Sequence, residues 1–191
     1  MNKQTFFGAI SAGILIGIGV IININLTIPI IGALLFSFGL LTIMQLKLPL
    51  YTGKIGFAFY GQKNLPIILL GNLIGIIWAI SCYYGGNPAI AQQLTTAAVI
   101  KFSKTPLQMF FGGVICGMLI HFAVKAKATV MTIMAVMIFI LIGSEHCVAD
   151  FAYFLFTPVG ISNIIKFLLV ILGNSIGAIS LEWILRLAEN E

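Results

Sequence analysis

The sequence predicts an all-α membrane protein with six transmembrane helices in an inverted repeat of three plus three, in which the second and fifth helices are broken. The first observation is composition: of 191 residues, 60% are hydrophobic and only 8% are charged, against about 25% charged in soluble domains. The second is a series of six apolar segments, each near the roughly 20 residues needed to cross a bilayer. The third is a glycine–asparagine motif that occurs once in each half of the chain.

The charge pattern argues against nucleic-acid binding, although the net charge is +5. The ten basic residues lie singly between apolar runs, which is typical of loops that flank membrane helices. No polar block is long enough for a soluble domain, so we expect residues 1–191 to form one transmembrane channel domain. Cys82, Cys116 and Cys147 are odd in number and lie among apolar residues, which predicts buried, inert thiols without disulfides.

The first apolar segment is longer than the hydrophobic region of a signal peptide, about 7–15 residues, and meets no clear cleavage site. We therefore expect it to be the first transmembrane helix. The six segments are Phe6–Ile24, Ile30–Phe59, Leu65–Tyr84, Leu107–Val124, Val130–Phe156 and Ile164–Leu185.

The second and fifth segments are longer than one crossing requires, and both are interrupted midway. In the second, Pro49 lacks a backbone donor and Gly53 permits a left-handed backbone, which together predict a tight loop. In the fifth, the interruption is Glu145–Asp150. Because non-helical backbone at membrane depth persists only where it is buried in protein or lines a cavity, the two breaks predict one shared site.

The third and sixth segments share a motif about 100 residues apart. Gly71-Asn72-Leu73-Ile74-Gly75 in the third recurs as Gly173-Asn174-Ser175-Ile176-Gly177 in the sixth. Three spans per repeat are an odd number, so the second copy enters the bilayer from the opposite side, as in many transporters and channels. We expect the four glycines of these motifs to allow close helix packing.

The basic residues predict the orientation. If the N-terminus is inside, the inner set is Lys3, Lys54, Lys63, Lys125, Lys127 and Arg186, and the outer set is Lys101, Lys104 and Lys166. Lys47 falls in the broken stretch. The excess on the inner side predicts a multi-pass protein of the cell inner (cytoplasmic) membrane with both termini in the cytoplasm.

The polar cluster of the fifth segment holds the candidate functional residues. A charge at the centre of a bilayer helix costs about 2.5–3.5 kcal/mol, so such residues usually serve a purpose. His146 is either a core histidine bonded to a carbonyl or a hydrogen-bond or proton donor in a pore, because imidazole titrates near neutral pH. Glu145 and Asp150 either favour the positive N-terminal end of a half-helix or accept a proton.

The residues from Gly143 to Asp150, with Thr157-Pro158-Val159-Gly160 downstream, resemble the fifth-helix signature of the formate/nitrite transporter family, usually Gly-Phe-Glu-His-Ser-Ile-Ala-Asn. Phe36-Ser37-Phe38-Gly39-Leu40 followed by Leu50-Tyr51-Thr52 is similar to that family's second helix and its Leu-Phe-Thr break. The resemblance implies an aquaporin-like protomer with its own pore, assembled as a homopentamer. It also implies passage of small monovalent anions such as formate, nitrite, hydrosulfide or lactate, without enzymatic activity or a cofactor.

The resemblance also implies roles for individual residues. His146 matches the central pore histidine, and Leu50, Tyr51 and Thr52 match a mobile loop in which Thr52 faces the histidine. Phe36 and Leu40 match the apolar constriction on one side of a central chamber, and Phe139 matches the other. Read without the family, Phe36 and Phe139 are packing residues; their placement beside the two breaks makes gating an equal alternative.

Three departures from the family pattern bear on substrate and gating. The family's asparagine is replaced by Asp150, and a small–acidic pair before the leucine by Leu48-Pro49. An asparagine of the fourth helix aligns with Gly117, with His121 one turn later.

A mechanism can be outlined from these expectations. Hydrophobic constrictions oppose a bare anion, whereas Lys47 and Lys54 near the mouths would concentrate anions. In the chamber, Thr52 and His146 would donate hydrogen bonds, and an anion that takes a proton there could cross as a neutral acid. The sequence leaves two sources for that proton, His146 and bulk water.

Three alternatives belong to other classes. Asn87-Pro88-Ala89 matches the aquaporin signature, but that mechanism needs two copies and this one follows glycines in an expected loop. An intramembrane metalloenzyme would use His121, Glu145, His146 and Asp150 as ligands, although their spacing does not fit the His-Glu-x-x-His pattern. A substrate-binding subunit of a vitamin importer would share the size and six spans, but the two broken helices argue against it.

Overall fold

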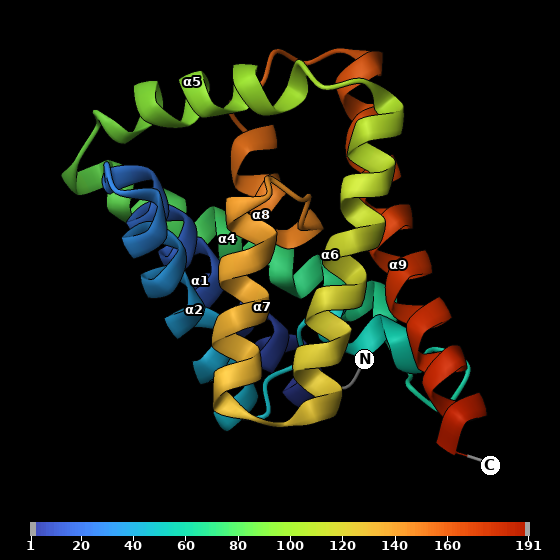
Figure 1. The fold of residues 1–191 in the computed structure, drawn as a ribbon. Helices are drawn as coiled ribbons and strands as arrows, with labels where there is room; N and C mark the ends of the chain where they lie inside the picture. The colour runs from blue at the N-terminus through green and yellow to red at the C-terminus, as the bar shows by residue number, and fades with distance from the viewer. Residues whose placement is uncertain (1–2, 190–191) are drawn as a thin grey trace.

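The computed structural model describes residues 3–189, and all the regular structure in that range is helical (Figure 1). The helices are α1 (Lys3–Asn25), α2 (Pro29–Gln45), α3 (Tyr51–Lys54), the 3₁₀ helix η1 (Ile55–Phe57), α4 (Leu65–Gly86), α5 (Ile90–Phe102), α6 (Pro106–Ala126), α7 (Thr129–Leu141), α8 (Cys147–Phe154) and α9 (Ile161–Glu189).

Four helices, α1, α4, α6 and α9, are long and apolar enough to cross a membrane. The apolar helices α2 and α7 have 17 and 13 residues; at 1.5 Å per residue, both are shorter than the roughly 30 Å of hydrocarbon. Each is followed by an irregular stretch and then by a short helix, α3 or α8. The predicted breaks in the second and fifth segments are therefore confirmed. The second break ends at His146, so Cys147–Asp150 belong to α8 and not to the interruption expected at Glu145–Asp150.

Glycines bring the long helices together in two pairs, α1 with α4 and α6 with α9. A Cβ atom on Gly75 would lie 2.1 Å from the carbonyl oxygen of Ile10, and one on Gly177 would lie 2.1 Å from that of Val114. A Cβ on Gly173 would lie 2.3 Å from Phe110 O, and one on Gly71 would lie 2.7 Å from the Cβ of Ala9. No larger residue fits these contacts, so the expected packing role of the four glycines is confirmed.

Both breaks begin with the same helix ending. Lys47 (φ 54°) and Gly143 (φ 70°) each adopt the left-handed conformation just after a helix. In both, the next residue's amide reaches back five positions: Leu48 N to Ile43 O and Ser144 N to Phe139 O, each 2.9 Å. This is the Schellman motif. The expected left-handed position at Gly53 is wrong, because Gly53 lies within α3 and Lys47 takes that conformation instead.

The helix α5 was not expected, because it lies between the third and fourth apolar segments and is not among the six predicted spans. Its buried residues follow each other at intervals of four, which places them on one helical face: Ile90, Leu94, Ala98 and Phe102. Figure 1 shows α5 lying across the end of the molecule opposite the start of α1 and the end of α9. It thereby covers the end of the molecule at which α8 lies (Figure 1).

Candidate functional site

Two buried asparagines form hydrogen bonds to the backbone at the two helix breaks. Asn72 Nδ2 donates to the carbonyl oxygens of Ala9 (2.8 Å) and Pro49 (3.0 Å), and its Oδ1 accepts from Tyr51 N at 2.8 Å. The side chain therefore binds α1, the extended stretch and the first amide of α3 at once. Backbone groups that a regular helix would have paired internally are satisfied in this way.

Asn174 repeats this arrangement in the second half. Its Nδ2 donates to Gly113 O (2.8 Å) and Glu145 O (2.7 Å), and its Oδ1 accepts from Cys147 N at 2.8 Å. Both asparagines are fully buried. The repeated motif predicted the packing role of the flanking glycines but not the hydrogen bonds of the asparagines to the breaks. The signal for them was the asparagine at the same place in both copies.

Thr52 and His146 meet where the two short helices α3 and α8 begin. Thr52 Oγ1 and His146 Nε2 are 2.9 Å apart, and both side chains are almost completely buried. His146 Nδ1 accepts a hydrogen bond from Ala149 N at 3.1 Å, so His146 is the N-cap of α8. A ring nitrogen that accepts carries no proton. The ring proton is therefore on Nε2 and is donated to Thr52.

Two cavities lie on opposite sides of this contact. One, of about 170 Å³, opens beneath α5 and is lined by Phe36, Phe139, His146 and the polar residues around them. The other, of about 490 Å³, is lined by Leu40, Leu50 and residues of the lower end. Thr52 and His146 are thus near the centre of the molecule.

The aromatic residues pair differently from the expectation. Phe36 and Phe139 pack edge to face with ring centroids 5.9 Å apart, and Phe139 stacks on His146 at 5.6 Å. Leu40 instead lines the opposite cavity together with Leu50. The assignment of Phe36 with Leu40 to one side and Phe139 to the other is therefore wrong: the two phenylalanines lie on the same side.

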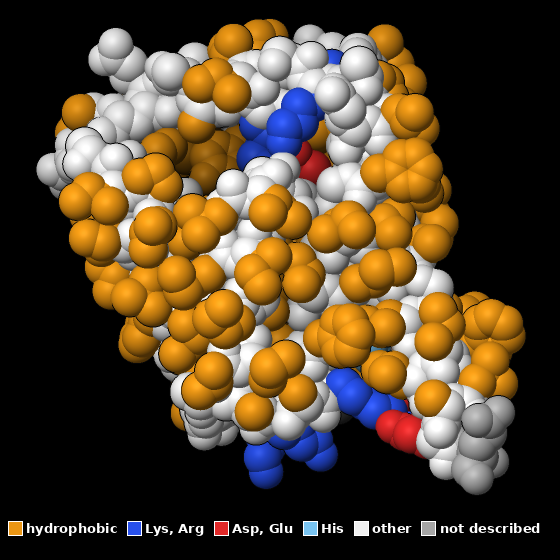
Figure 2. Space-filling view, viewed as in Figure 1, with side chains coloured by type: hydrophobic (Ala, Val, Ile, Leu, Met, Phe, Trp, Pro, Cys, Tyr) orange, Lys and Arg blue, Asp and Glu red, His pale blue; other side chains and the backbone are white. Residues whose placement is uncertain are grey.

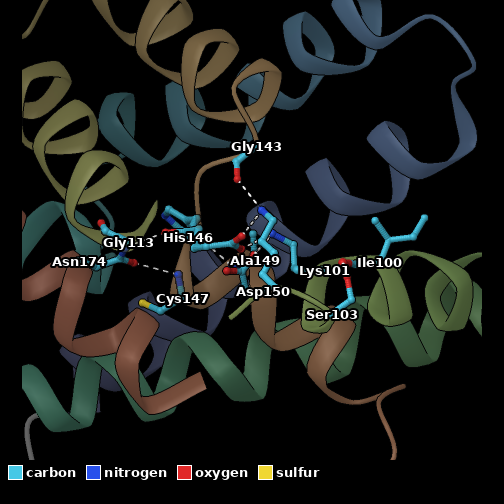
Figure 3. A network of polar contacts seen from close by, with 12 residues as sticks. Ile100, Lys101, Ser103, Gly113, Gly143, His146, Cys147, Ala149, Asp150 and Asn174 are labelled. Atoms are coloured by element: carbon cyan, nitrogen blue, oxygen red, sulfur yellow. Dashed lines mark hydrogen bonds and ion pairs between the residues drawn. The ribbon is translucent and has the colours of Figure 1, made fainter. Parts of the chain in front are cut away.

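A charged cluster lies beneath α5, where Figure 2 shows basic and acidic side chains in a hollow surrounded by hydrophobic ones. Lys101 Nζ binds Glu145 Oε2 and also Asp150 Oδ1, the latter at 2.9 Å (Figure 3). Lys104 Nζ binds Glu145 Oε1 and, at 2.8 Å, Gly143 O. Glu145 is thus an ion-pair partner of two lysines, and the N-cap of α8 is His146 rather than Glu145. Sequence reasoning missed Lys101 and Lys104, because α5, which carries Lys101, was missed.

The electrostatics of the cluster keep Lys101 charged. Burial lowers the pKa of its ammonium, but the carboxylates of Asp150 and Glu145 raise it by more, so the pKa lies above its ordinary value. Tyr153 adds its ring face, 5.5 Å from Lys101 Nζ.

Lysines also surround the cavity at the lower end. Lys47, Lys54 and Lys127 line it, and Lys47, Lys54 and Lys63 border a neighbouring depression beside the start of α1. Lys47 and Lys54 border both cavities, and their expected position at a pore mouth stays a prediction. Tyr51, in contrast, does not line either of these cavities, and its hydroxyl lies 2.9 Å from Ser175 Oγ of α9.

The ligand set of the metalloenzyme alternative is not assembled. His121 Nε2 lies 2.8 Å from Glu182 Oε2, and Arg186 and Lys125 bind the same carboxylate. His121 is therefore engaged with α9 rather than with Glu145, His146 and Asp150. Within residues 3–189, no three His, Cys, Asp or Glu side chains are grouped to hold a metal ion.

Two further expectations concern small residues. A Cβ on Gly117 would lie 2.2 Å from Asn174 O, so the asparagine found there in the family would not fit this backbone. Cys116 and Cys147 are buried and free as expected, whereas Cys82 is free but exposed, so the burial predicted for Cys82 is wrong.

A family profile and two solved structures that resemble this chain all carry descriptions of formate/nitrite transporters or channels. The sequence profile described as "Formate/nitrite transporter" matches residues 2–187. A solved structure described as "Pentameric formate channel with formate bound" superposes with a TM-score of 0.79 at 21% identity, over 98% of this chain and 97% of the other. One described as "FNT family ion channel" gives 0.74 at 20% identity, over 97% and 88%. No curated protein sequence matches the chain.

Proposed function

Because this chain belongs to the formate/nitrite transporter family, we propose that it is a channel for small monovalent anions such as formate, nitrite, hydrosulfide or lactate. The solved structures that share its fold are described as channels, and we infer a transport function rather than an enzymatic one. The observation that carries the proposal is the Thr52–His146 hydrogen bond between two cavities at opposite ends of the molecule.

The proposed path runs from the lower cavity to the cavity beneath α5. Lys47 and Lys54 at the lower mouth attract anions. Between the cavities, Leu40 and Leu50 on one side and the Phe36–Phe139 pair on the other form two apolar layers. A bare charge crosses such layers at high cost, since they offer no replacement for its water shell.

Thr52 and His146 supply the polar contact between the layers. Because His146 Nε2 already gives its proton to Thr52 Oγ1, the hydroxyl hydrogen of Thr52 can point to an anion. His146 itself cannot take a second proton on Nδ1 without losing the hydrogen bond from Ala149 N. We therefore infer that His146 orients a donor and that the proton for a neutral acid comes from another source.

The architecture proposed for the protomer is six spans in an inverted repeat, aquaporin-like in form. Support comes from the equivalent hydrogen bonds of Asn72 and Asn174 and from the matching Schellman motifs at Lys47 and Gly143. We propose a homopentamer with one pore in each subunit, since a structure of the same fold is described as pentameric. We place the protein in the inner membrane with both termini in the cytoplasm.

Flux measurements in proteoliposomes test the proposal. Stopped-flow uptake of formate, nitrite, hydrosulfide, acetate and lactate is compared with and without a pH gradient. We expect Thr52→Val, which removes the hydroxyl but keeps the shape, to lower the flux of accepted anions about tenfold or more, the equivalent of one hydrogen bond to a charge. Thr95→Val, on the exposed side of α5, is the matched control.

His146→Asn separates the two roles of the histidine. Asparagine is a good N-cap, so the variant should assemble, and we expect lower flux with an unchanged shape of the pH profile. A profile that loses its pH dependence would instead make His146 the proton donor. Wild-type liposomes no more permeable to these anions than empty liposomes would refute the channel.

A further inference from the structure

One carboxylate oxygen in the charged cluster has no donor. Asp150 Oδ1 accepts from Lys101, but Asp150 Oδ2 is buried and receives no hydrogen bond from the described residues. The Glu145 carboxylate binds the same ammonium, Lys101 Nζ, and is therefore its neighbour. Two neighbouring carboxylates, one with an unpaired oxygen, are stabilised when they share a single proton. Asp150 with a proton on Oδ2 would satisfy this oxygen.

Asp150 also lies on the proposed path. Its side chain is 3% exposed and lines the cavity beneath α5 together with His146 and the Phe36–Phe139 pair. The titratable groups around it are Lys101, Lys104, Glu145, His146, Tyr153, Cys116 and Cys147. The two lysines are bound by carboxylates and both ring nitrogens of His146 are engaged. Asp150 is therefore the member of the cluster with a position open for a proton.

We propose that Asp150 holds a transferable proton and gives it to an anion in this cavity. The inference rests on the proposed function and specifies its substrate class: the anions of weak acids, which can accept that proton. The family's usual asparagine at this position could not perform the step, so the replacement seen in the sequence gives this chain a proton donor of its own.

The charges of the cluster balance through the transfer. With a neutral Asp150, the charges of Lys101, Lys104 and Glu145 sum to +1, which attracts a monovalent anion. The O–H bond of the Asp150 carboxyl then breaks, and the proton forms an O–H or S–H bond on the anion. Asp150 becomes a carboxylate, the cluster becomes neutral, and the neutral acid crosses the phenylalanine layer. A hydronium ion from the outer solution then gives a proton to the Asp150 carboxylate and leaves as water.

Asp150→Asn tests the proposal in liposomes that contain a trapped pH dye. In the wild type we expect formate influx to acidify the lumen, with one proton for each formate. In Asp150→Asn we expect formate influx to fall about 100-fold, the low end of the contribution of a positioned proton donor, while nitrate, the anion of a strong acid, enters no more slowly than in the wild type. Glu189→Gln, the same kind of change at an exposed carboxylate on the far end of α9, should match the wild type.

Further measurements make the outcome decisive. Asp150→Glu retains an acid and should recover part of the formate flux with its coupled acidification. Independently of transport, the infrared band of a protonated carboxyl should be present in the wild type at pH 7 and missing in Asp150→Asn. Wild-type formate flux and acidification in Asp150→Asn, or no such band in the wild type, would overturn the proposal. If liposomes with the wild-type protein showed no formate flux, the channel function itself would be refuted.

Discussion

At the scale of single residues, the side chains of Asn72 and Asn174 are hard to replace because of their hydrogen bonds. Each makes three hydrogen bonds to backbone groups of three separate segments. An amide is the only uncharged side-chain group that can donate twice and accept from the same position. Leucine or alanine would leave buried backbone groups unpaired, each at about 1–3 kcal/mol.

Asn174→Asp is the sharpest test of this role. The aspartate keeps the size and the acceptor for Cys147 N, but it loses both donors and places oxygen against the carbonyls of Gly113 and Glu145. We expect a loss of at least about 3 kcal/mol, seen as a lower unfolding temperature in detergent. Asn163→Asp makes the same change at an exposed side chain and should alter that temperature little. Equal effects of the two changes would show that Asn174 is not a structural clamp.

At the scale of the elements, both breaks begin with a Schellman motif, but different residue types occupy its left-handed position. Gly143 suits the left-handed position, whereas Lys47 occupies it with a side chain, at a cost of roughly 1–2 kcal/mol. We expect Lys47→Gly to raise the unfolding temperature and Gly143→Ala to lower it, by amounts that correspond to about 1 kcal/mol each.

The control is Gly85→Ala. A Cβ at Gly85 would meet no heavy atom within 4 Å, and its φ is not left-handed. We expect that variant to be neutral or slightly more stable, because alanine is the better helix former. A lower unfolding temperature in Lys47→Gly would mean that the lysine stabilises the break by other contacts.

The long helices, both breaks and the glycine contacts follow from apolar length, Pro49, the buried charges and the repeated motif. The left-handed residue is Lys47 rather than Gly53, because the position is set by hydrogen bonds back to α2, which single residue types do not reveal. The helix α5 was overlooked because its Thr and Gln residues lower its hydropathy, although its apolar residues recur every four positions.

The site was predictable only in part. The meeting of Thr52 with His146 follows from the family resemblance, and the structure contains it. The pairing of Phe36 with Phe139 and the lysine partners of Glu145 depend on how helices distant in sequence pack, so no local pattern indicated them.

At the scale of the whole molecule, charged side chains gather at two opposite ends, which differ in how their lysines are paired. Figure 2 shows a largely hydrophobic flank between them, with basic side chains at the lower edge. At the upper end, Lys101 and Lys104 are paired with carboxylates and Lys166 Nζ binds Phe102 O at 2.7 Å. The lower end gathers Lys47, Lys54, Lys63 and Lys127 around its cavities. This asymmetry favours the lower end as the cytoplasmic one.

Cysteine labelling tests that orientation without altering any charge. In a Cys82→Ser background the remaining thiols, Cys116 and Cys147, are buried, so a single introduced cysteine reports its own side of the membrane. Gln93→Cys places a thiol on the exposed surface of α5, and Gln62→Cys places one in the loop before α4, at the lower end.

With a membrane-impermeant maleimide added to right-side-out vesicles, we expect Gln93→Cys to react at once and Gln62→Cys to react only after the membrane is permeabilised. The opposite pattern would reverse the orientation, so that anions leaving the cell would meet the Asp150 cavity first. Rapid labelling of both thiols before permeabilisation would contradict the claim that the two ends of the molecule lie on opposite sides of the membrane. The result thus decides from which side of the membrane protons reach Asp150, and with it the pH gradient that would drive weak acids through the pore.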